Sequence, residues 1–308
     1  MAEKITVVGS YNTGFIIYVD RLPTKGETMP GRGFRMEHGG KGSNQAIQSS
    51  RLGCETTIVA RVGRDVFGER ALNKWRKENI NTSHVVLDGE NPTGAGLIIV
   101  GPAGDNIIAV DLGANMRLSR EDVDNALDSI EDADVIVSQL EIPIDTALHS
   151  LRGRDADTIL NPAPAHGIPP EKLKGINIIT PNEVEIKTLA GHKPEENIDV
   201  TEIGLKYAKY VEYVIITLGE KGAVIIDKTG RKTQIPAPRV DAVDSTGAGD
   251  AFNGALAAAL ARGYAIEEAV EYACYAGAFL AARIKQGELV EALATARELE
   301  KFISDNGG

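Results

Sequence analysis

Cysteine is scarce in this chain, which has only Cys54 and Cys274 among its 308 residues. Neither lies in a Cys-x-x-Cys or Cys/His cluster, so the sequence predicts neither a disulfide framework nor a structural zinc site. Long hydrophobic runs are missing as well. The small-residue run 255–261 is far too short to span a bilayer, and the N-terminus lacks the apolar stretch of a signal peptide. We therefore expect a cytoplasmic protein with no membrane partner.

Positive charge is also in short supply. The chain has 33 Lys and Arg against 44 Asp and Glu, which gives a net charge of −11 and an isoelectric point near 5.1. Such a surface disfavours nucleic acid and anionic membranes as partners. No Walker A loop (Gly-x-x-x-x-Gly-Lys-Ser/Thr) is present, and the nearest segment is 39–43. No dinucleotide fingerprint follows the first apolar run, which argues against a dinucleotide-dependent oxidoreductase.

What is present is an alternation of short β-branched runs with helix-period segments. This alternation is typical of an α/β core around a mostly parallel sheet. Buried strands are expected at 5–8, 56–61, 135–138, 158–160, 176–179 and 214–217, with 223–227 forming a hairpin with the last of these. Helices are expected at 42–52, 69–78, 120–130, 145–151, 182–189, 247–262, 266–283 and 289–303.

Two segments break this pattern, at 14–37 and 93–111. The second reads as a β-hairpin, and neither segment is followed by a helix that would complete a βαβ unit. Four extra strands beside an α/β core favour a small β-sheet, and a sheet next to a pocket is a candidate lid. We therefore predict a core of 1–13, 38–92 and 112–308, with 14–37 and 93–111 as a discontinuous β lid.

The segment 244–254, with the sequence DSTGAGDAFNG, precedes an alanine-rich helical stretch. Gly247, Ala248 and Gly249 would form the turn at the helix N-terminus, where small residues and backbone N–H groups suit an anion. Asp250 would lie beside that anion site and accept a proton from an attacking hydroxyl. For an isolated motif of this kind, a tight turn with a helix-capping Asp would be the favoured explanation. Here the motif is longer and is joined by others.

Paired with the segment 39–46, GGKGSNQA, this motif resembles the two signatures of the phosphofructokinase-B-type carbohydrate kinases. The segments 113–115, 161–165, 179–185 and 214–219 match members of that family in the same order. The resemblance implies a ribokinase-like fold, a three-layer α/β/α core with a small β-sheet lid that mediates a homodimer. It also implies ATP-dependent phosphorylation, with Mg²⁺, of a primary hydroxyl of a pentose such as D-ribose.

Other substrates on the same fold stay open, namely a nucleoside, deoxyribose or another sugar or polyol. A sugar phosphate is less favoured, although Arg32, Arg35 and Lys41 could supply positive charge for it. A non-catalytic sugar-binding protein is a further alternative. The joint presence of Asp250 and the glycine turn before it argues against that alternative.

By resemblance, the sugar pocket is formed by Asn12, Gly40, Lys41, Asn44 and Glu141. Glycine lets backbone N–H groups approach a hydroxyl, and an Asn amide offers both a donor and an acceptor. Members of the family carry an Asp two residues after this first Asn, where the present chain has a glycine, at position 14. A lost carboxylate in a hydroxyl-binding site is expected to reduce affinity or change the substrate.

The nucleotide cleft is assigned by resemblance to Asn182, Thr217, Gly219 and Gly222. Asn182 and Glu185 would also organise Mg²⁺, largely through water, since magnesium keeps most of its waters. The same Asn-x-x-Glu pattern at a helix start is typical of a capping box, and the two roles are compatible.

A monovalent cation site, for K⁺, is implied for Asp244 and the carbonyl of Thr246. The second half of such a loop would fall at 283–288, where the sequence RIKQGE departs from the family pattern.

Overall fold

The computed structural model describes residues 3–102, 105–283 and 289–307. Its largest element is a nine-stranded sheet in the order β13-β12-β11-β10-β9-β8-β1-β4-β5, in which the pairs β11–β12 and β12–β13 are antiparallel and the others parallel. The strands are β1 (Lys4–Val8), β4 (Glu55–Gly63), β5 (Asn81–Asp88), β8 (Val135–Ser138), β9 (Asp157–Leu160), β10 (Ile178–Ile179), β11 (Tyr213–Thr217), β12 (Ala223–Asp227) and β13 (Lys232–Ile235).

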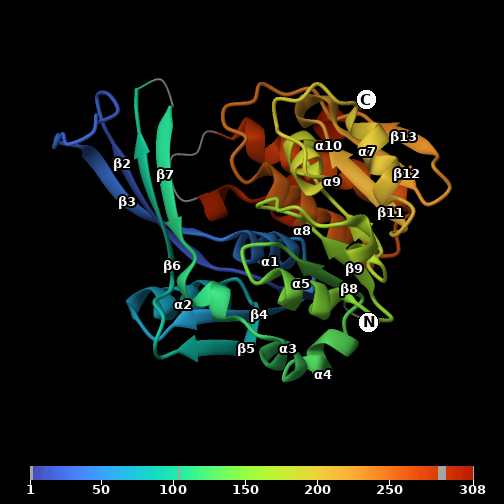
Figure 1. Cartoon of the computed structure of the whole chain (residues 1–308), viewed down its shortest axis with the longest axis horizontal. Coiled ribbons are helices and arrows are strands. Elements are labelled where there is room, and N and C mark those ends of the chain that lie inside the picture. The colour runs from blue at the N-terminus through green and yellow to red at the C-terminus, as the bar shows by residue number, and fades with distance from the viewer. Residues whose placement is uncertain (1–2, 103–104, 284–288, 308) are drawn as a thin grey trace.

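Helices cover both faces of this sheet (Figure 1). Neighbouring residues of one strand belong to different cores, as Val7 and Val8 do, because alternate side chains point to opposite faces. Burial on both faces explains why these strands are continuous apolar runs. The core that contains Val7 includes helices α1 (Lys41–Arg51), α2 (Val66–Lys77), α8 (Ala248–Ala261), α9 (Ile266–Ala282) and α10 (Ala296–Asn306). The core that contains Val8 includes helices α3 (Arg120–Asp124), α4 (Leu127–Glu131), α5 (Ile144–Leu151), α6 (Glu183–Leu189) and α7 (Val200–Tyr207).

Two helices that the sequence predicts as continuous are divided. The segment 120–130 forms α3 and α4, separated at Asn125 and Ala126. The segment 289–303 forms the 3₁₀ turn η4 (Leu289–Ala292) and then α10, because Thr295 and Glu298 make a capping box that starts a new helix. The sequence analysis also missed β5, β13 and α7.

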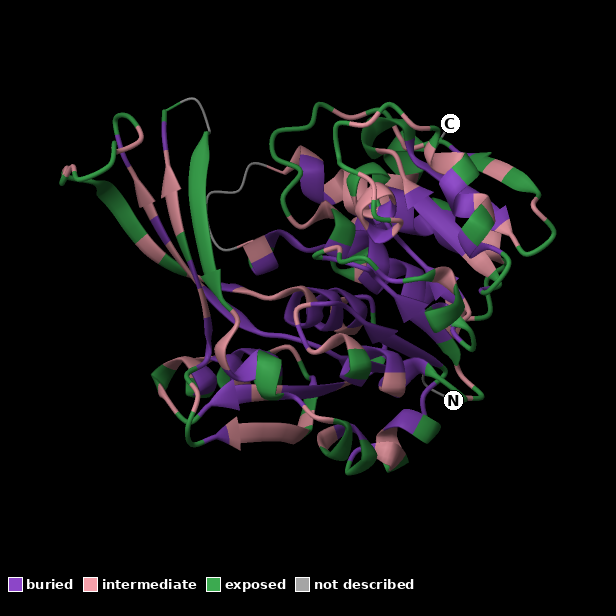
Figure 2. Cartoon of the chain, viewed as in Figure 1, coloured by how far each residue is buried: buried purple, intermediate pink, exposed green. Residues whose placement is uncertain are grey.

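The segments that interrupt the core form a second, four-stranded sheet in the order β3-β2-β6-β7. Its strands are β2 (Asn12–Tyr18), β3 (Arg32–Gly39), β6 (Gly94–Val100) and β7 (Asn106–Asp111), and β2 and β6 run parallel. Residues 103 and 104 of the predicted hairpin turn lie outside the described residues. The sheet stands beside the core (Figure 1), and its edge strand β7 is exposed throughout (Figure 2). Strand β2 starts two residues before the predicted segment 14–37, and strand β3 ends two residues after it.

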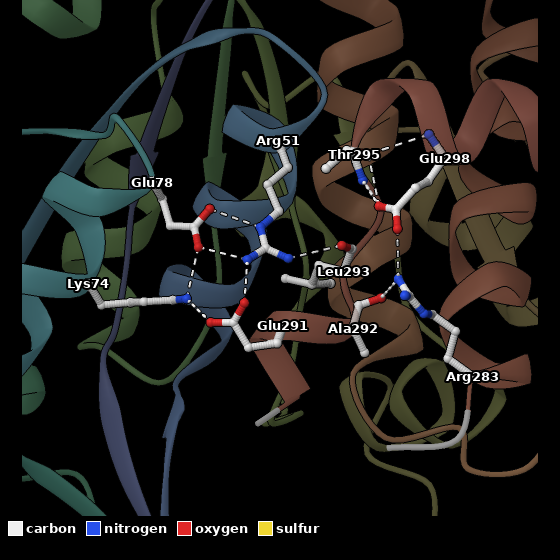
Figure 3. Close-up of polar contacts among 9 residues, drawn as sticks. All are labelled: Arg51, Lys74, Glu78, Arg283, Glu291, Ala292, Leu293, Thr295 and Glu298. Atoms are coloured by element: carbon white, nitrogen blue, oxygen red, sulfur yellow. Dashed lines mark hydrogen bonds and ion pairs between the residues drawn. The ribbon is translucent and has the colours of Figure 1, made fainter. Parts of the chain in front are cut away.

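An ion-pair network ties the 3₁₀ turn η4 to helices α1 and α2 (Figure 3). Arg51 donates to both oxygens of Glu78, at 2.8 and 2.7 Å, and Lys74 lies 2.8 Å from Glu78. Glu291 of η4 accepts from Arg51 at 3.1 Å and pairs with Lys74. Three of the four side chains are largely buried, so the network fixes η4 in place, and η4 in turn contacts the lid strand β3.

Across residues 3–102, 105–283 and 289–307, none of the helices combines the length and the apolar character that a membrane crossing requires.

Candidate active site

Asp250 lies in the first turn of α8 and is only 6% exposed. Two side-chain amides hold its carboxylate: Asn44 Nδ2 donates to Oδ2 at 2.9 Å, and Gln45 Nε2 donates to Oδ1 at 3.1 Å. Both amides come from α1, which packs against α8. The carboxylate is therefore oriented by fixed donors on a neighbouring helix before any substrate binds.

The turn before Asp250 requires glycine at its first position. Gly247 has φ 76°, in the left-handed region, and a Cβ there would lie 2.8 Å from the side chain of Leu289. The N–H groups of the first helical turn have no carbonyl partner within α8, although the Ala248 N–H donates to the Ser245 carbonyl at 3.1 Å just before the helix. The helix dipole adds positive potential at this end. A Cβ built on Gly249 meets nothing within 4 Å, so the space beside this turn is open. The turn is thus suited to an anion.

The predicted sugar-binding segment forms a second turn, at the start of α1. Gly40 has φ 92°, and a Cβ on it would lie 2.6 Å from the Cα of Tyr11. The backbones of the two segments therefore touch, which only glycine allows. Glu141 braces the same turn, because its Oε2 accepts from the Lys41 N–H at 2.8 Å and from Ser10 Oγ at 2.5 Å.

Lys41 stands among the predicted catalytic and binding carboxylates. Burial alone would lower the pKa of Lys41, but Asp250, Glu141 and Glu185 outweigh that effect and raise its pKa above the usual range. Burial raises the pKa of Glu185, while its hydrogen bond with the Asn182 N–H and the charge of Lys41 act in the other direction. A lysine that stays protonated in this environment can neutralise charge where an anionic group reacts.

The two asparagines predicted for the sugar pocket, Asn12 and Asn44, each have one side-chain atom in a hydrogen bond. Asn12 Oδ1 accepts from Asn115 Nδ2 at 2.9 Å. Asn115 also clamps the Tyr11 backbone, donating to its carbonyl at 2.8 Å and accepting from its N–H at 2.9 Å. Asn44 gives its amide to Asp250, while its buried Oδ1 has no hydrogen-bond partner among the described residues. That oxygen is an acceptor available to a hydroxyl beside the base.

The residues predicted for the nucleotide line a cavity of about 730 Å³. Asn182 and Thr217 are neighbours there, bridged between the ends of β10 and β11, where ligands bind in parallel α/β sheets. Ala248 and Gly249 form part of the same wall. The cavity therefore reaches the N-terminus of α8 and is of the size of a small-molecule site. Its lining also includes Gly219, Gly222, Ser245, Phe252, Cys274 and Gly277.

Asn182 and Glu185 form the capping box that the sequence allows. Asn182 Oδ1 accepts from the Val184 and Glu185 N–H groups, and Glu185 Oε2 accepts from the Asn182 N–H at 2.9 Å. In residues 3–102, 105–283 and 289–307, three or more His, Cys, Asp or Glu side chains do not gather into a metal cluster. A half-buried carboxylate with one oxygen engaged fits a magnesium ion held through water rather than by a full protein cage.

The predicted monovalent-cation loop is only half described. Asp244 Oδ1 accepts from the Thr246 N–H at 2.8 Å, which closes a tight turn just before α8. Of the second half, at 283–288, only Arg283 is among the described residues.

Sequence reasoning missed the polar layer beneath Asp250. Gln45 donates to Asp250 and to Asn161 Oδ1, at 3.2 Å, and accepts from Gln139 Nε2 at 2.7 Å. Gln45 and Asn161 both stand inside motifs that the sequence analysis quoted, so a signal was present. Their contacts join three segments of the chain that no local pattern connects.

The chain is similar to known carbohydrate kinases over nearly its whole length. The sequence model of a protein family, described as "pfkB family carbohydrate kinase", matches residues 2–293. A ribokinase of Haemophilus influenzae is 34% identical over 276 residues, covering 88% of this chain and 90% of that protein. A deoxyribokinase of Salmonella typhi is 32% identical over 281 residues, covering 89% and 91%. The solved structure of an Arabidopsis thaliana ribokinase complexed with ribose and ATP superposes with a TM-score of 0.86 at 28% identity, covering 98% of this chain and 99% of that one.

The chain belongs to the pfkB family of carbohydrate kinases. It has the ribokinase-like fold predicted from the sequence, and it is an ATP-dependent sugar kinase.

Proposed function

We propose that this protein transfers the γ-phosphoryl group of ATP to a primary hydroxyl of a pentose, with D-ribose as the first candidate. The single observation that carries this proposal is the placement of Asp250. Its carboxylate is buried, held by two amides, and located in the helix turn that the 730 Å³ cavity reaches. The relatives that are named for ribose, and the deoxyribokinase, support a pentose as substrate.

The reaction needs few protein groups. The substrate hydroxyl loses its proton to Asp250 as its oxygen bonds to the γ-phosphorus, and the bond from that phosphorus to the ADP oxygen breaks. The N–H groups of the Gly247–Asp250 turn and the Lys41 ammonium stabilise the charge on the transferring group. Asn44 Oδ1 and Asn12 Nδ2 orient the sugar beside the base, and Glu141 holds the turn that carries Lys41.

Asn182, Thr217, Gly219 and Gly222 would hold the nucleotide in the cavity they line. Glu185 and Asn182 would hold Mg²⁺ through water, and the ion would neutralise charge on the phosphates. Asp244 and the Thr246 carbonyl are assigned to a monovalent cation, K⁺, next to the same helix end.

An unphosphorylated sugar is favoured over a sugar phosphate. Both lid arginines are paired with carboxylates, Arg35 with Glu37 and Arg32 with Asp20. Glu141 adds negative charge next to Lys41. A phosphate on the substrate would therefore meet neutralised or repulsive groups.

The proposal includes a homodimer formed through the lid and a cytoplasmic location, where ATP is available. Phe34, Leu97 and Ile107 lie on the same face of the lid sheet as Phe15 and are 46–63% exposed, and β3 and β7 are the edges of that sheet. Exposed apolar side chains beside unpaired edges are typical of a surface that a second copy covers. We expect sedimentation equilibrium to give a dimer for the wild type and a monomer for Leu97→Lys, whereas Val66→Lys on α2 stays dimeric.

The test of the proposed function is ADP release by the purified chain with ATP and Mg²⁺ across a panel of sugars and nucleosides. We expect D-ribose to give the highest kcat/KM. Asp250→Asn should bind sugar as the wild type does but turn over about 10² to 10⁴ times more slowly, since it lacks a general base. Near-normal turnover in Asp250→Asn would remove the base assignment. Preference for a nucleoside would redirect the substrate and leave the mechanism intact.

A further inference from the structure

One face of the lid sheet has almost no side chains next to the sugar-binding turn. Asn12 and Gly14 share a face of β2, because alternate residues of a strand point the same way. Across the ladders, Gly14 is paired with Glu37 of β3 on one side and with Gly96 of β6 on the other. Directly opposite residues share a face, so Glu37 projects beside a floor of two glycines on the face that Asn12 occupies.

The opposite face of the lid packs on the core. Phe15, next to Gly14 in sequence, makes an edge-on contact with Phe67 of α2, with ring centroids 5.3 Å apart. His38, next to Glu37, accepts from Arg70 of α2 at 3.3 Å. The face that carries Glu37 is therefore turned away from α2, together with Asn12.

The Asn12 end of this face adjoins the turn that carries Lys41. A Cβ on Gly40 would lie 2.8 Å from the Asn12 nitrogen, so the strand and the turn are in contact. Position 14 lies two residues along β2, about 7 Å from position 12, and Glu37 is one strand spacing to its side. A pentose that contacts Asn12 and Lys41 would lie within reach of a side chain at either position.

The Glu37 side chain is also held in place by its neighbours and is not a solvated surface carboxylate. Its side chain is 13% exposed, and its Oε1 lies 2.9 Å from Arg35 Nε. The Arg35 guanidinium in turn lies over the Tyr18 ring, 5.3 Å from its centroid. The Arg35 contact restricts the orientation of the carboxylate, which reduces the entropy that a ligand must overcome.

We infer that Glu37 is a specificity-determining residue that accepts hydrogen bonds from sugar hydroxyls in the space that Gly14 leaves open. A carboxylate accepts from two adjacent hydroxyls at once, so the ligand class is an unphosphorylated sugar with neighbouring hydroxyl groups. The carboxylate that recognises the sugar is then on the edge strand β3, whereas the Asp of other family members would be at position 14, on β2. This inference rests on the proposed sugar-kinase function.

The test compares Glu37→Gln with Asp20→Asn, a matched lid carboxylate that is paired with Arg32 but 82% exposed. We expect Glu37→Gln to raise the sugar KM about 10- to 100-fold, with kcat and the ATP KM within about threefold of the wild type. For Asp20→Asn, the sugar KM, kcat and the ATP KM should each stay within about twofold of the wild type. On pentoses that each lack one hydroxyl, Glu37→Gln should also discriminate less than the wild type.

A rescue variant separates sugar contact from a structural role of the ion pair. A Cβ on Gly14 would meet Glu37 Cβ and Ile98 Cδ1 at 3.8 Å, which is ordinary contact, so an Asp is accommodated there. Gly14→Asp combined with Glu37→Gln should recover most of the sugar KM, although it does not rebuild the Arg35 pair. If Glu37→Gln leaves the sugar KM unchanged while the wild type is active, this inference alone is overturned. If the wild type phosphorylates no sugar, the proposed function fails first.

Discussion

Gln45 Nε2 lies 3.1 Å from Oδ1 of Asp250, although the two residues are 205 positions apart in sequence. The same glutamine accepts a hydrogen bond from Gln139, which fixes which end of its amide faces the carboxylate. Gln45 is thus a positioning residue for the proposed base.

Gln45→Leu should therefore impair catalysis more than folding. We expect kcat to fall about 10- to 100-fold with the sugar KM within about threefold, because the carboxylate loses one of its two fixed donors. The matched control is Gln48→Leu, one turn further along α1, whose amide is also buried but donates to the Ala294 carbonyl. Equal losses of kcat in both variants would contradict the assignment.

Gly40 and Gly26 allow backbone strain to be separated from steric contact. Both have left-handed φ values, 92° and 84°, but only at Gly40 would a Cβ meet other backbone atoms. Replacing either with Ala should cost about 1–2 kcal/mol from the conformation alone. At Gly40 the contact with Tyr11 should add about 1–3 kcal/mol and raise the sugar KM. Urea unfolding and steady-state kinetics on both variants check this, and identical behaviour of the two would show that the close approach has no effect.

The network of Figure 3 provides a matched pair of carboxylates with different burial. Glu78 is 12% exposed and neutralises Arg51 and Lys74, whereas Glu291 is 59% exposed. Glu78→Gln leaves buried cations without their partner and should lower the free energy of unfolding by about 3–5 kcal/mol. Glu291→Gln should lower it by less than about 1 kcal/mol. Urea titrations measure both, and a larger effect at Glu291 would contradict this order.

His38 should make folding stability depend on pH. Burial first, and then the charges of Arg70 and Lys74, lower the pKa of His38 to about 4. Its Nε2 accepts from Arg70, which only the neutral ring can do. The unfolded chain then binds the proton more readily, so stability is complete above about pH 6.5 and declines as the pH falls toward 4. In His38→Gln this decline should be shallower, whereas the exposed His166→Gln should match the wild type. Thermal unfolding from pH 7 to 4.5 measures the slopes.

Much of the fold was predictable, because its signals are local. Continuous apolar runs such as 135–138 are buried on both faces, and the glycine turn before Asp250 precedes a helix that starts at Ala248. The division of the segment 289–303 was missed although Thr295 and Glu298 have the spacing of a capping box.

Other features depend on pairing between distant segments. The parallel alignment of β2 with β6 joins residues about 80 positions apart, and no local pattern encodes it. The contacts of Asn115 with Tyr11, and of Gln45 with Asp250, are of the same kind. The predicted roles of Asn12, Lys41, Glu141, Asn182, Thr217 and the cation residues Asp244 and Thr246 stay predictions until they are tested by substitution.

Helix α8 carries the base, and its alanines Ala251, Ala255, Ala257, Ala258 and Ala259 are fully buried. Gly254 of the same helix leaves no room for a Cβ against Gln45 and Gln48. A seam of such small residues tolerates little change in volume. The lid is a thin sheet whose glycine-lined face accepts new side chains without disturbing that seam. Natural variation, and directed evolution toward other sugars, can therefore alter substrate choice through the lid while the phosphoryl-transfer machinery is inherited unchanged.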